Sequence, residues 1–122
     1  LNQKIKAKNF DLIIFADVLE HLKNPKQVLQ DFSNHTDKFI VSIPNMNFFI
    51  YKIFPKRENP PKGESQHIHH WTLKNFKKII PKEFEIKDVH YCSDFPEFRW
   101  SNILFPNISF FNQTLMLRIE RS

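Results

Sequence analysis

The sequence predicts an α/β fold in which helices cover a largely parallel sheet. The first observation is a continuous apolar run, "FDLIIFA" at residues 10–16, which contains the β-branched Ile13 and Ile14. Such a run is typical of a strand buried on both faces. The second is a helix-start signal at Asn24-Pro25, and the third is another apolar run, "FIVSIP" at residues 39–44. Strand, helix and strand in this order form a βαβ unit, whose crossover is right-handed.

The helix between these two strands has a well-defined expected start. Asn24 suits the N-cap position, Pro25 suits the first helical position, and Gln27 completes the spacing of a capping box. The helix is expected to continue to about residue 34, with Val28, Leu29 and Phe32 facing the core. Pro44 is expected to end the second strand.

The middle of the chain predicts two short helices separated by a loop. Residues 46–54 are apolar enough for a short helix, whereas residues 55–66 are polar and contain three prolines and the only glycine, Gly63. Long loops of this kind are often lids or binding loops. A further helix is expected to start with Thr72 as its N-cap, with Trp71 packed on Phe76, and to stop at Pro81. Its expected apolar stripe consists of Leu73, Phe76, Ile79 and Ile80.

The last third of the chain predicts two strands. Residues 84–91 alternate and then change phase between Ile86 and Val89, which predicts a bulge. Residues 113–121 alternate cleanly, with Leu115, Leu117 and Ile119 on one face. A short helix is expected at residues 100–105.

Composition limits the possible functions. The chain has 122 residues, with 41% hydrophobic and 25% charged, which suits one globular domain. No apolar run approaches the roughly eighteen residues of a membrane span, so no membrane partner is expected. The net charge of +5 comes from scattered lysines, which favours a solvated surface over a nucleic-acid-binding face. The single cysteine, Cys92, indicates a reducing cytoplasm.

Several segments together resemble a known family. The segments "ADVLEHLKNPKQVL", "SIPN" and "HIHHWTLKNF", following the first apolar strand, resemble the second half of class I S-adenosylmethionine-dependent methyltransferases. The nearest group contains the ubiquinone-biosynthesis O-methyltransferases and the MetW-like proteins of methionine biosynthesis. The resemblance covers about residues 9–92 and, more loosely, the final strand. It implies the last four strands of a Rossmann-like methyltransferase sheet, with an antiparallel final strand and flanking helices.

The resemblance also implies that part of the family's domain is missing from this chain. The family holds S-adenosylmethionine with a Gly-x-Gly turn after its first strand, and a chain with one glycine cannot supply that turn. Residues 1–122 are therefore expected to be the C-terminal part of a single methyltransferase domain. The first residue, Leu1, also indicates a processed product or a fragment. Alone, the chain is expected to bind no cofactor and to be inactive, and to self-associate through the exposed strand at residues 10–15.

Candidate cofactor residues lie at the end of the first strand. The resemblance places Phe15, Ala16 and Asp17 beside the methionine part of S-adenosylmethionine, at the carboxyl end where open α/β sheets bind ligands. An acid that favours the start of the following helical turn is an equally good interpretation of Asp17.

Candidate catalytic residues follow at Glu20 and His21. In a helical turn, Asp17 precedes them by three and four residues, so all three side chains can converge. A carboxylate with an imidazole forms either an acid–base pair or a metal site. In the resembling O-methyltransferases an acid-x-x-Glu-His pattern binds a divalent metal, although Asp17 stands here where glutamate is commoner. A purely structural turn is favoured over a metal site.

Histidines of the segment "HIHHWT" are the remaining candidates. His67 lies five residues before Thr72, a spacing at which the family often has an active-site histidine, and we expect it to line the acceptor pocket. His69 and His70 either extend a ligand set or are simply solvated, with His70 the second choice. Structural roles are expected for His35, His90 and Cys92.

The expected function is methyl transfer to a small-molecule acceptor, at oxygen, in a longer parent protein. His21 or His67 would remove the proton of a hydroxyl acceptor, whereas a carboxylate acceptor needs no base. Two alternatives stay open. One is metal-dependent 2′-O-methylation of RNA ribose, and the other is a non-catalytic, MetW-like module that binds a partner acyltransferase.

Overall fold

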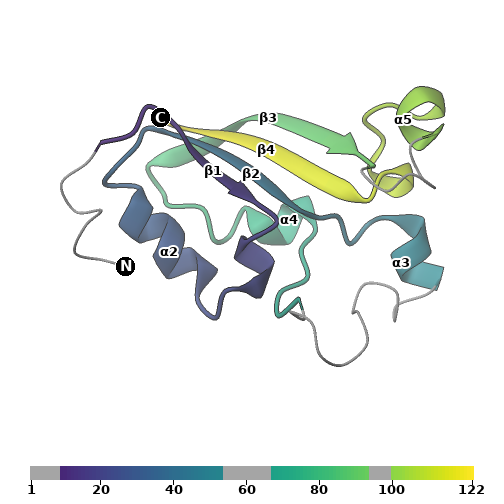
Figure 1. Ribbon diagram of the computed structural model, residues 1–122, viewed down its shortest axis with the longest axis horizontal. Helices are drawn as coiled ribbons and strands as arrows, with labels where there is room; N and C mark the ends of the chain where they lie inside the picture. The colour runs from purple at the N-terminus through teal and green to yellow at the C-terminus, as the bar shows by residue number, and fades with distance from the viewer. Residues whose placement is uncertain (1–8, 54–66, 94–99) are drawn as a thin grey trace.

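The computed structural model describes residues 9–53, 67–93 and 100–122 as one sheet with helices packed against it (Figure 1). The elements are, in chain order, β1 (Ile13–Ala16), the 3-10 helix η1 (Leu19–His21), α2 (Pro25–Phe32), β2 (Lys38–Pro44), α3 (Phe49–Ile53), α4 (Leu73–Phe76), β3 (Phe84–Cys92), α5 (Trp100–Leu104), the 3-10 helix η4 (Ser109–Phe111) and β4 (Thr114–Arg121). The α/β fold and the position of each expected strand are confirmed.

The sheet is mixed, with the strand order β1-β2-β4-β3. β1 and β2 are parallel, and Phe15 lies opposite Val41. β4, the last strand of the chain, inserts between β2 and β3 and is antiparallel to both. The expected antiparallel final strand is therefore confirmed, and it joins the βαβ unit to the closing β3–β4 pair.

One face of the sheet carries the hydrophobic core. Residues at every second position of β2 and β4 are fully buried there, namely Phe39, Val41, Ile43, Leu115, Leu117 and Ile119. Leu29 of α2 and Phe76 of α4 belong to the same cluster, and both helices lie on this side of the sheet (Figure 1). Each such side chain contributes about 1.5–3 kcal/mol by leaving water. The opposite face carries no helix among the described residues (Figure 1).

The start of α2 follows its expected capping pattern in part. The Asn24 side chain accepts a hydrogen bond from the Gln27 main-chain N–H at 3.3 Å, and Pro25 occupies the first turn. The Gln27 side chain donates to Asp31 at 2.9 Å, one turn further along, so the reciprocal half of the capping box is replaced by an i,i+4 bond. The helix ends at Phe32, two residues earlier than expected.

The helix expected after Thr72 is shorter than predicted. The Thr72 hydroxyl caps it by accepting from Asn75 N–H, and the Trp71 ring meets Phe76 edge-on at 5.2 Å, as expected. Only Leu73–Phe76 is α-helical, because the N–H groups of Lys78 and Ile79 bond to carbonyls three residues back. Such tighter bonds are common where an α-helix ends. The predicted loop at residues 55–66 lies outside the described residues.

The remaining elements match their expected places. The register of β3 against β4 shifts between Ile86 and Asp88, which confirms the predicted bulge. α3 and α5 occupy the two segments expected to form short helices. The described helices include none that combines the length and the apolar character needed to cross a bilayer.

Candidate functional site

The site begins where β1 ends, at Asp17. This residue has a φ of 49°, in the left-handed region that L-residues enter at a cost of about 1–2 kcal/mol. Two hydrogen bonds hold it there, since its N–H donates to the Ser42 carbonyl at 3.1 Å and its carboxylate accepts from the Ser42 hydroxyl at 2.7 Å. Strained residues fixed in this way are concentrated at functional sites. Asp17 therefore joins the carboxyl ends of β1 and β2.

The other two candidate cofactor residues differ in their orientation. The Phe15 side chain is buried in the core, where its ring contacts Phe32 at 5.6 Å and Phe39 at 6.0 Å. Ala16 and Asp17 are exposed at the strand end. A cofactor bound at this edge could therefore contact the main chain of Phe15 but not its side chain.

Glu20 is the most unusual side chain of the turn that follows. It has no exposed surface, and neither carboxylate oxygen has a hydrogen-bond partner among the described residues. Burial raises the pKa of the Glu20 carboxyl above 4.5. Its own main-chain N–H lowers this pKa, the nearby Asp17 raises it, and His21 lowers it. A buried carboxylate without a hydrogen bond is costly, which indicates a position prepared for a proton, a cation or a ligand.

Glu20, His21 and His67 converge in space. Nε2 of His21 lies 3.9 Å from Oε1 of Glu20, and the rings of His21 and His67 have centroids 4.8 Å apart. One potential donor atom from each of the three residues lies within 4.8 Å of the others. The three predicted catalytic residues thus meet at one point, although they come from segments 46 residues apart in the chain.

The convergence differs from the sequence expectation in one respect. Asp17 is outside this group and pairs with Ser42 instead. The donors that do meet, one carboxylate oxygen and two imidazole nitrogens, are ones that divalent first-row metals accept. The buried carboxylate, which has no hydrogen-bond partner among the described residues, fits a cation as well, so the residues present are compatible with a divalent metal. They are equally compatible with metal-free proton transfer.

Residues 67–71 are attached to the turn that carries Glu20. The main-chain N–H groups of Ile68 and His69 both donate to the Glu20 carbonyl, at 2.8 and 3.1 Å. The His69 ring bonds to the Leu22 carbonyl at 2.8 Å and stacks on Trp71. His69 therefore faces the turn and the core rather than the donor group, and His70 is exposed.

Asn45 is a residue of this region that sequence analysis missed. It is fully buried, and its amide nitrogen donates to the carbonyls of Ser109 and Asn112, both at 2.7 Å. It also pairs with Trp71 in an isolated β-bridge, so it connects β2 to both neighbouring segments. Its position directly after the strand-ending Pro44, in "SIPN", was the available signal.

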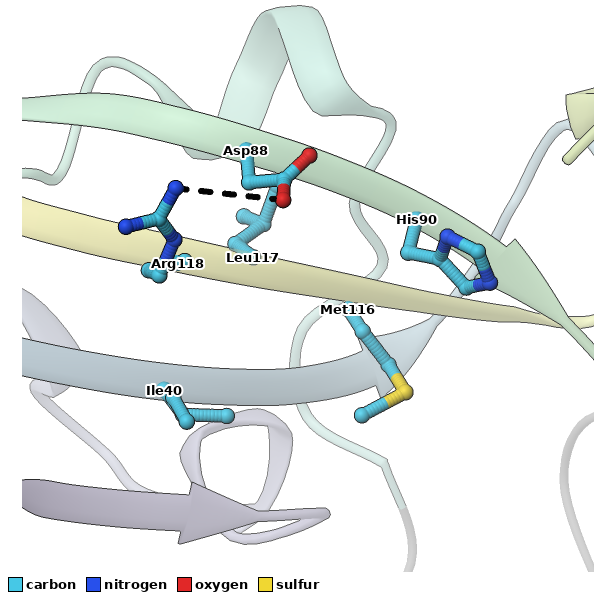
Figure 2. Close-up of a pocket in the computed structure, with 6 residues that line it drawn as sticks. All are labelled: Ile40, Asp88, His90, Met116, Leu117 and Arg118. Atoms are coloured by element: carbon cyan, nitrogen blue, oxygen red, sulfur yellow. Dashed lines mark ion pairs between the residues drawn. The ribbon is translucent and has the colours of Figure 1, made fainter.

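A hollow lies on the face of the sheet that carries no helix among the described residues. It has a volume of about 150 Å³ and is lined by Ile40, Asp88, His90, Met116, Leu117 and Arg118 (Figure 2). Arg118 lies 3.9 Å from Asp88, and the Met116 sulfur accepts from the Cys92 thiol at 3.6 Å. Apart from Leu117, whose side chain belongs to the core, these side chains lie on the face of the sheet away from the core. They are therefore separate from the cluster of Glu20, His21 and His67, called the Glu20 group below.

Comparisons with known proteins agree with this architecture. The family profile described as "Methionine biosynthesis protein MetW" matches residues 2–119. The chain belongs to the MetW family. No curated protein matches it significantly in sequence.

Several solved structures similar to this MetW-family chain are described as methyltransferases. The small RNA methyltransferase HEN1 superposes with a TM-score of 0.61 at 16% identity, over 97% of this chain and 14% of that one. A protein from Listeria monocytogenes, assigned to the S-adenosylmethionine-dependent methyltransferases, gives 0.59 at 13% identity, over 97% and 64%. The methyltransferase domain of bacterial CtHen1 gives 0.54 at 20% identity, over 98% and 56%. The chain thus spans less than two thirds of each, and the likeness shows a shared Rossmann-like methyltransferase fold.

Proposed function

We propose that this MetW-family chain is the acceptor-side part of an S-adenosylmethionine-dependent methyltransferase domain. The observation that carries the proposal is the meeting of Glu20, His21 and His67 beside the carboxyl end of β1. Ligands of open α/β sheets bind at this end, where the strained Asp17 also lies. Membership of the MetW family and the methyltransferase type of sheet support the same conclusion.

In the proposed reaction, S-adenosylmethionine supplies the methyl group to the oxygen of a small molecule. Ala16 and Asp17 would lie against the methionine part of the cofactor, which fixes the direction of attack. His21 or His67 would take the proton of the acceptor hydroxyl on an imidazole nitrogen. The Glu20 carboxylate, 3.9 Å from His21, would stabilise the imidazolium that forms.

We further propose that residues 1–122 are the C-terminal part of a single cytoplasmic domain. The solved methyltransferases that share this fold are longer, since the chain spans 64% of one and 56% of another. A preceding segment would supply the glycine-rich cofactor turn, because Gly63 is the single glycine of this sequence.

A metal-assisted reaction is the second candidate, and the donor set of Glu20, His21 and His67 favours it. These residues would hold a divalent cation, which polarises an acceptor oxygen and lowers the pKa of its proton. An acceptor with two neighbouring hydroxyls, such as an RNA ribose, suits this candidate. A MetW-like partner-binding role is the non-catalytic alternative, in which the three residues would be dispensable.

The test uses the complete gene product that contains this chain, with tritiated S-adenosylmethionine as methyl donor and either a small-molecule extract or small RNA as acceptor. Replacing Glu20, His21 or His67 by alanine should lower methyl transfer by about 10²-fold or more, the usual contribution of a positioned acid or base. His90→Ala, on the opposite face of the sheet, is the matched control and should leave transfer unchanged. Loss of transfer with EDTA would select the metal-assisted route, and full activity of all three variants would contradict both catalytic candidates.

A further inference from the structure

His69 connects the core of the molecule to the Glu20 group without joining it. Its ring is stacked on Trp71, with 5.1 Å between centroids and 7° between planes. Trp71 is itself buried, packs on Phe76 and pairs with Asn45 at the end of β2. On its other side the His69 ring bonds to the Leu22 carbonyl at 2.8 Å.

This contact shows that Nε2 of the His69 ring carries a hydrogen. A carbonyl oxygen only accepts hydrogen bonds, so Nε2 of His69 must carry the proton and donate it. An Nε2 that donates to Leu22 is unavailable to hold a cation or to take a proton from an acceptor. The group of converging donor atoms also leaves His69 out, so His69 has a different task from His21 and His67.

The geometry around His67 suggests what that task is. The far end of the segment is attached through Trp71 to Asn45 and Met46. Near His67 the main chain is attached to the turn at one atom, the Glu20 carbonyl, which accepts from the N–H groups of Ile68 and His69. The His69 side chain adds a second attachment, two residues further along the turn at Leu22. Two separate attachments to the turn fix the direction of the beginning of the segment, where His67 lies.

We infer that His69 is a positioning residue that holds His67 beside Glu20 and His21. The inference rests on the proposed role of that group, and it extends the role to a residue that contributes no donor atom. Because the His69 ring is only half-buried, we expect it to matter more for the position of His67 than for the stability of the fold.

The test compares two substitutions of His69 in the 122-residue chain. His69→Phe keeps a ring that can stack on Trp71 but has no N–H, whereas His69→Gln keeps a donor that can reach the Leu22 carbonyl. With Co²⁺ as the probe, followed by its visible absorption, His69→Phe should weaken binding by roughly tenfold or more, as is usual for residues that orient ligands. His69→Gln should recover most of the affinity for Co²⁺. His90→Phe, on the opposite face, should bind Co²⁺ as tightly as the unsubstituted 122-residue chain does.

A second measurement makes the result independent of metal binding. Amide hydrogen exchange at Ile68 reports its bond to the Glu20 carbonyl, and His69→Phe should accelerate it by about tenfold while β2 and β4 amides keep their rates. If the unsubstituted 122-residue chain binds no Co²⁺, the metal-assisted candidate fails. The exchange rate of the Ile68 amide then decides the role of His69 by itself. Unchanged exchange at Ile68 in His69→Phe would overturn the inference in either case.

Discussion

Glu20 has an environment that opposes its own charge. Its side chain is fully buried, its carboxylate oxygens have no hydrogen-bond partner among the described residues, and Asp17 adds a nearby negative charge. A carboxylate kept under these conditions reduces the free energy of unfolding, since the ionised form is better solvated in the unfolded chain. Natural proteins retain such residues mainly where activity requires them. The loss of stability caused by the Glu20 carboxylate is thus an argument for a functional role, and it can be measured.

Replacing Glu20 with glutamine should stabilise the metal-free chain at neutral pH. The folded pKa of Glu20 lies above 4.5, so the native state loses stability as pH rises from 4.5 through the folded pKa. Glutamine has the same shape without the charge, and the gain at pH 7 should be on the order of 1 kcal/mol. Below pH 4.5 the carboxyl is protonated in both states, and the gain should largely disappear. Urea unfolding at pH 4 and pH 7, in the presence of EDTA, measures the difference.

Glu83 provides a control, because its carboxyl pKa is shifted in the opposite direction to that of Glu20. Its own main-chain N–H lowers its pKa, and hydrogen bonds from Gln30 and Ser33 lower it further. Glu83 therefore stabilises the fold above pH 4.5, and this stability is lost as pH falls through the folded pKa. Glu83→Gln should reduce stability at pH 7. A Glu20→Gln variant that is also less stable at pH 7 would contradict the account of Glu20.

At the scale of elements, local patterns predicted the strands and helix starts well. The alternation of β4 and the phase change in β3 placed both strands and the bulge, because side-chain period depends only on neighbouring residues. The N-caps Asn24 and Thr72 were predictable for the same reason. The end of α4 was not, since hydrogen bonds at Lys78 and Ile79 tighten the chain before Pro81 is reached.

The site was predictable only in part. Glu20, His21 and His67 were named as candidates because their spacing resembles a known family, and the structure brings them together. Asn45 was missed, and His69 was expected to extend a ligand set or to be solvated rather than to bond to a carbonyl. Both contacts depend on carbonyl groups of distant segments, at Leu22 and at Ser109 and Asn112. Polar residues that connect elements leave no periodic pattern in the sequence. Their hydrogen-bond partners appear only once the chain has folded.

Asn45→Ala should loosen the junction between β2 and the segment that precedes β4. It removes both amide bonds, to the Ser109 and Asn112 carbonyls, and the bond that the Asn45 side chain accepts from Asn47 N–H at 3.1 Å. Buried groups left unpaired in this way should lower the free energy of unfolding by about 2–4 kcal/mol. Chemical denaturation measures the loss, and faster amide exchange at residues 109–112 would locate it. The exposed Asn34→Ala is the control, and an equal effect there would contradict the role of Asn45.

At the scale of the whole molecule, the described helices leave one face of the sheet open. α2 and α4 cover the face that carries the core residues Val41 and Leu117 (Figure 1). Ile40 and Met116 lie on the other face (Figure 2), as does Ile14, which pairs with Ile40. Ile14 is 61% exposed and Met116 37% exposed. Parallel pairs such as β1–β2 are normally covered on both faces, whereas antiparallel pairs such as β3–β4 can leave one face open. β1 is also an edge strand of the described sheet, so apolar side chains and unpaired main-chain groups occur together there.

Replacing Ile14 with lysine should therefore reduce self-association of the 122-residue chain. A charged side chain on an edge strand opposes pairing with a second copy, and it removes an apolar contact worth about 1.5–3 kcal/mol, so the dissociation constant should rise by tenfold or more. Sedimentation velocity over a range of concentrations measures the change. Two copies could associate along the edge of β1 or through their open faces. Met116→Lys, on the same face but in the inner strand β4, distinguishes these two modes. If it has the smaller effect, the copies pair along the edge of β1; if both substitutions act equally, the open faces stack. An unsubstituted 122-residue chain that stays monomeric at all concentrations would contradict the prediction, because the exposed edge of β1 would then not cause association.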